Sequence, residues 1–557
     1  MADVVILALN SGYVHSALAP WYLKAAAGDL PLSLEVIEHT VNESVRTVVE
    51  DIVKRSPRLL AISVYIWNVQ VVRDLAALIK KRLPDIVLAV GGPEVSYNSA
   101  DVLKCTPEID YVICGEGETP FRQLCGALIT GRGMPIPGVA YRQGGRIVPA
   151  EPYAGKGTPV SPYTDEYLST LRGRIAYFES SRGCPYACAY CLSGRCDGLR
   201  FFDTDYVYEN LLRLVNSGAK VIKFVDRTFN ADRKRAYALF SFLIDAYGKT
   251  IPRGVCFHFE LSGDLLDDET VALLSAAPRG LFQFEIGIQS FHPETIRAIR
   301  RATDSRVLKR RIRQLASAGR AHIHVDLIAG LPYEDFPHFC GSFNQAYALG
   351  ADMLQLGFLK ILHGTELEAR ASEYGLCYSD TPPYEVTGTP WLSGADIALL
   401  KTAERAVDRL HNSGRFRRTL SLCIPLFHTP FDLFLSAGRC MEGAVSLDAL
   451  TDRLFDFLCR TFPKYAEQIR DALVCDRLAT NSSRGLPSSL YRADPRLKSI
   501  RACLNQTSET AVSSGVRRNV AILYGSGRAV FADYSDDRFD GREYILSFVP
   551  LTKEGSP

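Results

Sequence analysis

The first 130 residues alternate between short apolar runs and amphipathic stretches. The run Val4–Leu9 is continuously apolar, which is typical of a strand buried on both faces of a parallel sheet. Stretches with helical periodicity, such as Glu43–Lys54 and Val71–Arg82, separate the apolar runs. This alternation predicts right-handed βαβ units and a doubly wound α/β sheet. Its strands are expected at Val4–Leu9, Leu34–Ile37, Leu59–Tyr65, Ile86–Val90 and Tyr111–Cys114.

Polar and glycine-rich turns follow four of these predicted strands. Ligands of a doubly wound sheet bind at the carboxyl ends of its strands, near the point where the strand order switches. The turns are therefore candidates for a ligand site. They are Asn10-Ser11-Gly12, Ser63-Val64-Tyr65, Gly91-Gly92-Pro93-Glu94 and Gly115-Glu116-Gly117.

A second alternating block runs from 174 to about 365, after a segment rich in Gly and Pro. We interpret that segment, 131–172, as a linker with one small hairpin. Six strands with intervening helices favour a partial (β/α)6 barrel, whose chemistry gathers at the carboxyl ends of the strands. The strands are expected at Ile175–Ser180, Val221–Val225, Cys256–Leu261, Leu281–Ile288, Ile323–Ile328 and Met353–Leu359.

The pattern becomes mainly helical after the barrel, with helices expected over Gly394–Ser413 and Leu447–Cys475 and a strand pair over Asn519–Ala532. A chain of 557 residues is too long for one ordinary domain. We therefore expect an N-terminal Rossmann-like domain, a linker, a barrel and a mainly helical C-terminal domain. Their predicted bounds are 1–130, 131–172, 173–370 and 371–557.

Charge and hydropathy narrow the range of partners. The 64 Lys and Arg against 62 Asp and Glu give a net charge of +2, which argues against a protein that grips nucleic acid phosphates. No window approaches the length of a membrane-spanning apolar run, and the N-terminus lacks the pattern of a signal peptide. We expect a cytoplasmic protein with no membrane or nucleic-acid partner. Most of the 15 cysteines are then expected to be reduced and buried.

Three cysteines differ from the others in their spacing. Cys184, Cys188 and Cys191 follow a predicted barrel strand at once. Three thiolates at spacings of four and three can hold three corners of a [4Fe–4S] cluster and leave the fourth iron without a protein ligand. That iron can be chelated by the amino and carboxylate groups of S-adenosylmethionine (SAM). Zinc is the rival metal, with Cys196 as a fourth ligand, but structural zinc sites usually take their ligands as two pairs.

The CxxxCxxC motif after the first barrel strand resembles that of the radical SAM superfamily. Two further motifs are similar to those of oxygen-independent coproporphyrinogen oxidases: Gly287-Ile288-Gln289-Ser290-Phe291 with Arg300-Arg301, and Val325-Asp326-Leu327-Ile328-Ala329-Gly330-Leu331-Pro332. The resemblance implies that Tyr190 lies against the adenine of SAM. It also implies SAM contacts from four further residues, which are Glu260, Gln289, Arg301 and Asp326.

The chain departs from the superfamily after the second barrel strand. The Gly-Gly pair often found there, which receives the SAM amino group, is replaced by Val225-Asp226-Arg227-Thr228-Phe229-Asn230. Asp226 and Arg227 are expected to bind the methionyl ammonium and carboxylate by charge pairing. The alternative is a surface salt bridge at the end of the strand.

A doubly wound domain ahead of such a barrel resembles the cobalamin-binding class of radical SAM enzymes. The segment 7–23 also resembles a subgroup with an uncharacterised C-terminal domain. The resemblance implies that Tyr65 and Trp67 cover the lower face of the corrin, although both could be core aromatics. His15 lacks the surrounding D-x-H-x-x-G motif and is expected to be structural rather than a cobalt ligand. The residues predicted to contact cobalamin are Asn10, Ser11, Ser63, Tyr65, Trp67, Gly91, Gly92, Pro93, Glu94, Gly115, Glu116 and Gly117.

The resemblance implies a C-methyltransferase that uses a [4Fe–4S] cluster, SAM and cobalamin. A 5′-deoxyadenosyl radical would abstract hydrogen from an unactivated carbon of a small molecule, and methylcobalamin would supply the methyl group. An electron donor such as flavodoxin or ferredoxin is expected. The alternatives are a cobalamin-binding radical SAM cyclase or rearrangement enzyme, and a non-catalytic cobalamin sensor. A tRNA methylthiotransferase would need a second cluster, for which Cys105, Cys114 and Cys125 are poorly spaced.

Overall fold

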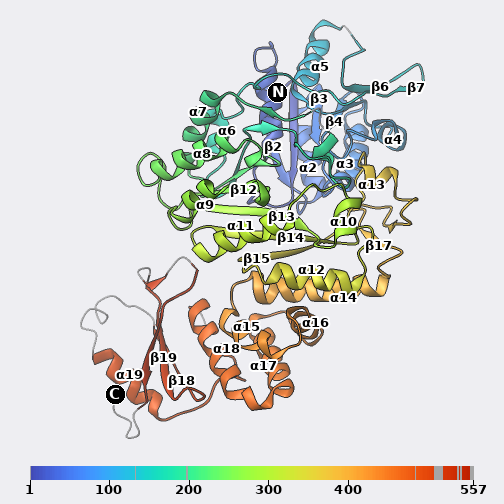
Figure 1. The fold of residues 1–557 in the computed structure, drawn as a ribbon. Coiled ribbons are helices and arrows are strands. Elements are labelled where there is room, and N and C mark those ends of the chain that lie inside the picture. Colours follow the sequence, from blue (N-terminus) through green and yellow to red (C-terminus); the bar gives the residue numbers. More distant parts are fainter. Residues whose placement is uncertain are drawn as a thin grey trace. The chain divides into compact units, whose positions relative to one another are not determined.

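The computed structural model of the protein describes residues 2–131, 133–195, 198–482, 485–506, 518–535, 538–539 and 542–551. Figure 1 shows its helices and strands. The chain forms two compact units. The first consists of Met1–Ile323, Gly330–Asp335 and Phe358–Ser393, and the second of His324–Ala329, Phe336–Gly357 and Gly394–Pro557.

The first unit opens with a sheet whose strand order is β2-β1-β3-β4-β5-β6-β7, and its first five strands are parallel. The order switches between β1 and β3, so the sheet is doubly wound as predicted. These strands are β1 (Val4–Asn10), β2 (Leu34–Thr40), β3 (Leu59–Ser63), β4 (Val87–Gly91) and β5 (Tyr111–Ile113).

Helices cover both faces of this sheet because alternate strand residues are apolar on both sides. One face packs Leu7, Ile62 and Val90 against α2, α3 and α4, and the other packs Ile6, Ala61 and Ala89 against α1 and α5. Both cores exclude water from the strand backbones. The helices are α1 (Ala19–Ala27), α2 (Val45–Arg55), α3 (Val69–Arg82), α4 (Ser99–Cys105) and α5 (Glu118–Thr130).

Part of the segment that the sequence predicts to be a linker extends this sheet. The expected hairpin is formed by β6 (Val139–Gln143) and β7 (Arg146–Val148), which add antiparallel strands beyond β5. Val139 and Ala140 are buried, which fixes β6 against the sheet. The remainder of 131–172 contains one short helix, α6 (Asp165–Ser169).

All six predicted barrel strands are present. Within the first unit, β8 (Ile175–Phe178), β11 (Val221–Phe224), β12 (Cys256–Leu261) and β13 (Phe282–Gln289) pair in parallel in that order. The remaining two are β14 (His322–Ala329) and β15 (Met353–Phe358). The short strands β9 (Ser181–Arg182) and β10 (Arg200–Phe201) flank the cysteine motif, and the helices of this block are α7 (Thr204–Val215), α8 (Arg233–Ala246), α9 (Asp268–Ser275), α10 (Pro293–Ala298) and α11 (Ser305–Ala318).

The second unit is mainly helical, as predicted, and its antiparallel sheet has three strands, one more than the sequence suggested. Buried Arg470 ties helix to sheet by donating to the carbonyls of Ile522 and Leu490, at 3.0 and 2.6 Å. Its elements are α12 (Phe336–Tyr347), α14 (Gly394–Ala406), α15 (Arg417–Cys423), α16 (Pro430–Cys440), α17 (Leu447–Thr461), α18 (Ala466–Thr480), α19 (Arg496–Gln506), β18 (Arg518–Leu523), β19 (Arg528–Asp533) and β20 (Leu546–Pro550), whereas α13 (Glu366–Ala369), β16 (Cys377–Tyr378) and β17 (Val386–Gly388) belong to the first unit.

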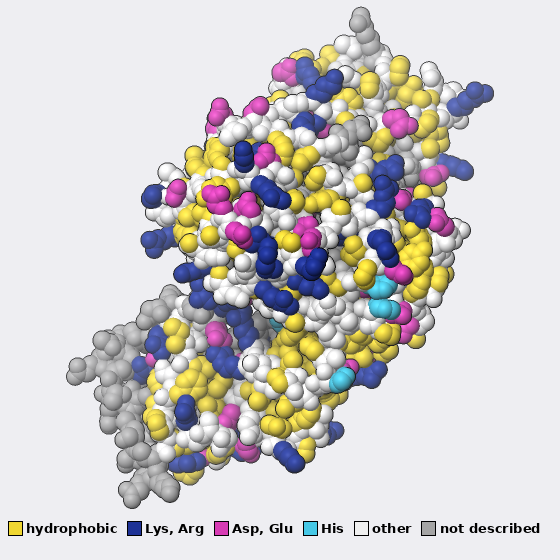
Figure 2. All heavy atoms as spheres, viewed as in Figure 1, with side chains coloured by type: hydrophobic (Ala, Val, Ile, Leu, Met, Phe, Trp, Pro, Cys, Tyr) yellow, Lys and Arg dark blue, Asp and Glu magenta, His cyan; other side chains and the backbone are white. Residues whose placement is uncertain are grey.

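The surface carries both signs of charge. Figure 2 shows Lys and Arg side chains interspersed with Asp and Glu on the visible face, in keeping with the small net charge of +2. Among the described residues, no helix alone has the length and apolar character needed to cross a bilayer. The bent pair Arg417–Leu426 and Pro430–Cys440 meets those two criteria jointly.

The packing of the barrel strands against their helices depends on a cluster of phenylalanines around Phe259. Five rings have centroids between 4.4 and 6.3 Å from that of Phe259, which is fully buried. Replacing Phe259 by Ala should lower the free energy of unfolding by about 3–5 kcal/mol, because it leaves a cavity in this cluster. Urea titration followed by circular dichroism measures the loss. The control Phe548→Ala, at an exposed position, should change it by less than about 0.5 kcal/mol.

Candidate active site

The carboxyl ends of the two parallel sheets share one cavity of about 670 Å³. Asn10, Ser63 and Gly91 line it from the ends of β1, β3 and β4. Tyr177 and Glu260 line it from β8 and β12 of the barrel. A ligand bound by the first domain would therefore face the barrel directly.

Ten of the twelve predicted cobalamin contacts line this cavity: Asn10, Ser11, Ser63, Tyr65, Trp67, Gly91, Gly92, Gly115, Glu116 and Gly117. Pro93 and Glu94 are not among the lining residues. The Glu94 carboxylate is buried and accepts a hydrogen bond from the Tyr384 hydroxyl at 2.5 Å, so it has a partner away from this cavity. Its predicted contact with cobalamin stays a prediction, and this geometry does not favour it.

Two glycines form a tight cradle on this side of the cavity. At Gly92, with φ of +120°, a Cβ atom would lie 2.4 Å from the Val64 carbonyl oxygen. At Gly115, with φ of +80°, it would lie 2.4 Å from the Tyr153 carbonyl oxygen. Neither position accepts a side chain without moving the backbone. The bare backbone lets a nucleotide tail approach closely, which fits the expected cobalamin.

Trp67 presents an exposed aromatic face to the cavity, where it would meet the corrin. Its ring is 49% exposed and stacks on Tyr65 with centroids 4.3 Å apart and planes at 5°. Its Nε1 donates to the Leu9 carbonyl at 3.2 Å, which fixes the orientation of the ring. A core aromatic would not remain so exposed. This geometry supports the interpretation of Trp67 as a wall of the ligand site.

His15 has the structural partner that its sequence context suggests. Its Nδ1 lies 2.7 Å from the Tyr177 hydroxyl, and both residues line the cavity. Burial lowers the pKa of His15, and the charges of Lys223 and Arg174 lower it further. The pair links the first domain to the first barrel strand.

The three cysteines of the motif lie in the loop after β9. Backbone bonds shape this loop: Ala189 N donates to Ile299 O at 2.9 Å, and Cys191 N donates to Cys188 O at 3.1 Å. Burial raises the pKa of the Cys188 thiol, against the lowering effect of Arg301. Within the described parts of the chain, no three His, Cys, Asp or Glu residues are grouped closely enough to hold a metal ion as they stand. Cys196 lies outside the described residues.

The donor set of this loop nevertheless fits a cluster. Three thiol side chains come from one short loop, with Cys184 and Cys191 part-exposed and Cys188 buried. The Cys184 Sγ lies 3.4 Å from the Thr228 hydroxyl, which itself donates to the Arg227 carbonyl at 2.8 Å. Three thiols and no fourth described cysteine in the loop match a cluster with one open iron.

Arg301, Tyr190 and Gln289 lie together beside the cysteine loop. Arg301 donates to the Tyr190 hydroxyl at 3.3 Å and to the Gly287 carbonyl at 2.6 Å. Gln289 has the rare φ of +70°, and its buried Oε1 has no hydrogen-bond partner in the described structure. A strained backbone and an unsatisfied buried acceptor are typical of ligand sites. These features support the predicted SAM contacts of Gln289 and Arg301.

Arg227 and Glu260 form a loose pair in the cavity, with 3.9 Å between NH1 and Oε1. Asp226 is not among the residues that line the cavity. Its carboxylate is 2% exposed and accepts hydrogen bonds from Ser180 N, Ser180 Oγ and Ser181 Oγ at 3.0, 2.7 and 2.5 Å. Its predicted contact with the SAM ammonium stays untested, and the geometry gives it a structural role instead.

Asp326, the last predicted SAM contact, lies on the β14 segment of the second unit. Its Oδ1 pairs with His324 Nε2 at 2.9 Å within that segment. The predicted role of Asp326 therefore stays a prediction.

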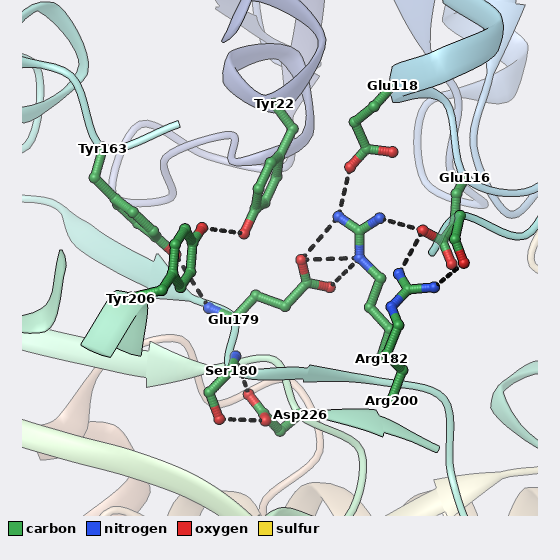
Figure 3. Close-up of polar contacts among 11 residues, drawn as sticks. Tyr22, Glu116, Glu118, Tyr163, Glu179, Ser180, Arg182, Arg200, Tyr206 and Asp226 are labelled. Atoms are coloured by element: carbon green, nitrogen blue, oxygen red, sulfur yellow. Dashed lines mark hydrogen bonds and ion pairs between the residues drawn. The ribbon is translucent and has the colours of Figure 1, made fainter. Parts of the chain in front are cut away.

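The sequence did not single out the buried charges that join the first domain to the cysteine loop. Figure 3 shows Arg182 donating to Glu116, Glu118 and Glu179, with Arg200 also donating to Glu116. Glu118 directly follows the predicted Gly117, and Arg182 precedes Cys184 by two positions, so their closeness to predicted residues was the available signal. Their pairing could not be inferred because it joins residues 64 or more positions apart in sequence.

Curated relatives cover parts of the chain. It is 29% identical over 294 residues to the 2-(S-pantetheinyl)-carbapenam-3-carboxylate methyltransferase of Streptantibioticus cattleyicolor, covering 50% of this chain and 43% of that protein. It is 28% identical over 360 residues to the cobalamin-dependent radical SAM methyltransferase TokK of Streptomyces tokunonensis, covering 60% and 52%. The chain spans about half the length of these relatives.

The fold of a solved structure covers more of the chain. Cobalamin-dependent SAM radical enzyme OxsB, solved with aqua-cobalamin bound, matches with a TM-score of 0.61 at 14% identity. The match covers 91% of this chain and 81% of OxsB. At this identity the similarity establishes the fold alone.

Replacing Cys184, Cys188 or Cys191 by Ala should each lower the iron and sulfide content of the reconstituted protein at least about tenfold, because the cluster would lose one of three protein ligands. Iron and acid-labile sulfide assays measure the loss. The control Cys105→Ala, an exposed thiol outside the motif, should keep the wild-type iron content. Retention of iron in all three motif variants would contradict the assignment.

Gly92→Ala should weaken cobalamin binding at least about tenfold, since the new Cβ forces the loop away from Val64. Equilibrium titration with hydroxocobalamin, followed by absorption, measures the dissociation constant. Gly126→Ala is a matched control, because a Cβ on that helical glycine meets nothing within 4 Å. Equal affinities of the two variants would show that the cradle does not hold cobalamin.

Models of three protein families match consecutive parts of the chain. The B12 binding domain matches residues 4–125, the radical SAM superfamily matches 178–344, and a protein of unknown function, DUF4080, matches 372–516. The first match covers the glycine cradle, and the second covers barrel residues that line the same cavity, such as Lys223 and Glu260. The chain therefore combines a B12-binding domain with a radical SAM domain and carries the uncharacterised DUF4080 region after them.

Proposed function

We propose that the protein methylates an unactivated carbon of a small molecule, using a [4Fe–4S] cluster, SAM and cobalamin. The observation that carries the proposal is the single cavity shared by the glycine cradle and the barrel strand ends. Methyl transfer to a substrate radical requires substrate, SAM and cobalamin to lie within one water-poor space. A cavity lined by Trp67 of the first domain and by Glu260 of the barrel supports such an arrangement.

The residues of the cavity have distinct tasks in this proposal. When bound, the cluster and SAM supply a radical that abstracts hydrogen, and cobalamin supplies the methyl group. Arg227 and Glu260 carry opposite charges at the barrel end and suit the carboxylate and ammonium of an amino acid moiety. Trp67 and Tyr65 give the cavity an aromatic wall formed by the first domain. Arg301 and Gln289 place a guanidinium and an unsatisfied amide oxygen beside the cysteine loop, where they would bind polar groups of SAM.

The relatives favour methyl transfer over cyclisation or rearrangement. Both curated relatives described above are named as methyltransferases, and each covers at least half of this chain. A small-molecule substrate, a flavodoxin- or ferredoxin-like electron donor and a cytoplasmic location belong to the same proposal. A reducing compartment suits a chain whose described cysteines are all free thiols.

Anaerobically purified full-length protein should show both iron–sulfur and corrinoid absorption. With SAM and a reductant it should release 5′-deoxyadenosine and also S-adenosylhomocysteine, the latter to about one equivalent per bound cobalamin even without substrate. Liquid chromatography with mass spectrometry measures both products. Formation of 5′-deoxyadenosine without S-adenosylhomocysteine would contradict methyl transfer and favour the cyclase or rearrangement alternative. Absence of both products from cluster-loaded protein would favour the sensor.

A further inference from the structure

Arg182 joins the start of the cysteine loop to the first domain. Arg182 ends β9, and only Gly183 separates it from Cys184. Gly183 has φ of +91°, and a Cβ there would lie 2.0 Å from the Gly198 carbonyl oxygen. Because this turn is packed so tightly, a displacement of Arg182 passes directly to the first cysteine.

The partners of Arg182 in the first domain belong to the cavity loop. NH1 donates to Glu116 Oε2 at 2.6 Å, and NH2 donates to Glu118 Oε1 at 2.5 Å. Glu116 lies between Gly115 and Gly117, which line the cavity on the cobalamin side. The same guanidinium therefore contacts the loop expected to meet cobalamin and is covalently next to the loop expected to hold the cluster.

Neighbouring groups fix this geometry from both sides. Arg200, the backbone partner of Arg182 in the β9–β10 pair, donates to the same Glu116 oxygen at 2.7 Å. Glu179 accepts from Arg182 Nε at 3.0 Å, and the Tyr22 ring packs 5.1 Å from the guanidinium carbon. Figure 3 shows the carboxylates of Glu116, Glu118 and Glu179 around the Arg182 guanidinium, with Arg200 against Glu116.

Burial makes the contacts of Arg182 hard to replace with water. The side chains of Arg182, Glu116, Glu118 and Glu179 are between 15% and 24% exposed. Charges in such surroundings keep their partners, because separation would leave each of them poorly solvated. A displacement of the Glu116 carboxylate should therefore move the Arg182 guanidinium with it, because water cannot easily replace either partner.

We propose that Arg182 is a positioning residue that couples occupancy of the cobalamin pocket to the order of the cluster loop. Cobalamin seated against Gly115 and Gly117 fixes Glu116, Glu116 fixes Arg182, and Arg182 fixes Cys184. By thermodynamic linkage, an ordered cluster loop strengthens cobalamin binding by the same factor. The coupling requires that both cofactors bind and does not depend on methyl transfer.

Amide hydrogen exchange tests the coupling in cluster-loaded, full-length protein with and without saturating hydroxocobalamin. In the wild-type protein, cobalamin should slow exchange of the peptide spanning 183–191 about tenfold, a typical size for coupled sites. In Arg182→Met the slowing should fall below about twofold, although saturating cobalamin is still bound. Glu116→Gln should reproduce this loss, which keeps the test decisive if Arg182→Met does not fold.

Arg174→Met is the matched control. Arg174 is even more buried than Arg182 and joins the same two parts of the first unit by donating to Glu38 Oε2 at 2.5 Å, but its hydrogen bonds do not reach the cysteine loop. It should retain the tenfold effect. The proposal is overturned if cobalamin leaves exchange of the loop unchanged in the wild-type protein, or if Glu116→Gln or a folded Arg182→Met retains the effect. Either result leaves the methyl-transfer proposal standing, since both cofactors would still be present.

Discussion

The site depends on buried ion pairs that hold the first domain against the barrel. A parallel sheet offers its ligand site only at the carboxyl ends of its strands, so two such sheets can share a ligand space only when those ends face each other. Loops at strand ends are polar and cannot be joined by a simple apolar core. Arg182 with Glu116 and Arg174 with Glu38 join them through charges that remain paired.

Buried ion pairs of this kind define the relative position of two elements more than they add to the free energy of unfolding. Burying charges carries a desolvation cost that their attraction offsets only when hydrogen bonding is complete. Arg182 meets this condition because every nitrogen of its guanidinium has a carboxylate acceptor. Although burial alone would raise the pKa of Glu116, hydrogen bonds from Arg200 and Arg182 lower it, so the carboxylate stays ionised near neutral pH. The junction is therefore directional, and a shifted arrangement would leave charges unpaired.

The sequence predicted the sheets because a strand buried on both faces leaves a continuous apolar run. The sequence indicated the residues around the cavity because glycine and polar residues follow the apolar runs of the predicted strands. It could not predict the junction, since Arg182 and Glu116 are 66 positions apart and nothing local indicates their pairing. The hairpin β6–β7 shows a similar limit, because a short pair of strands reveals its partner β5 only in three dimensions.

The alternation of side chains along an extended backbone explains why Glu260 lines the cavity and Asp226 does not. Side chains alternate between the faces of a strand, so His258 and Glu260 point to one face of β12 while Phe257 and Phe259 point to the phenylalanine cluster. On the neighbouring strand β11, Lys223 lines the cavity. The alternation continues past the end of that strand at Phe224, because Val225 and Arg227 also line the cavity. Asp226 follows Val225 by one position and therefore turns away, toward Ser180 and Ser181. Counting every second residue from Lys223 onward would have placed Asp226 on the side away from the cavity from sequence alone.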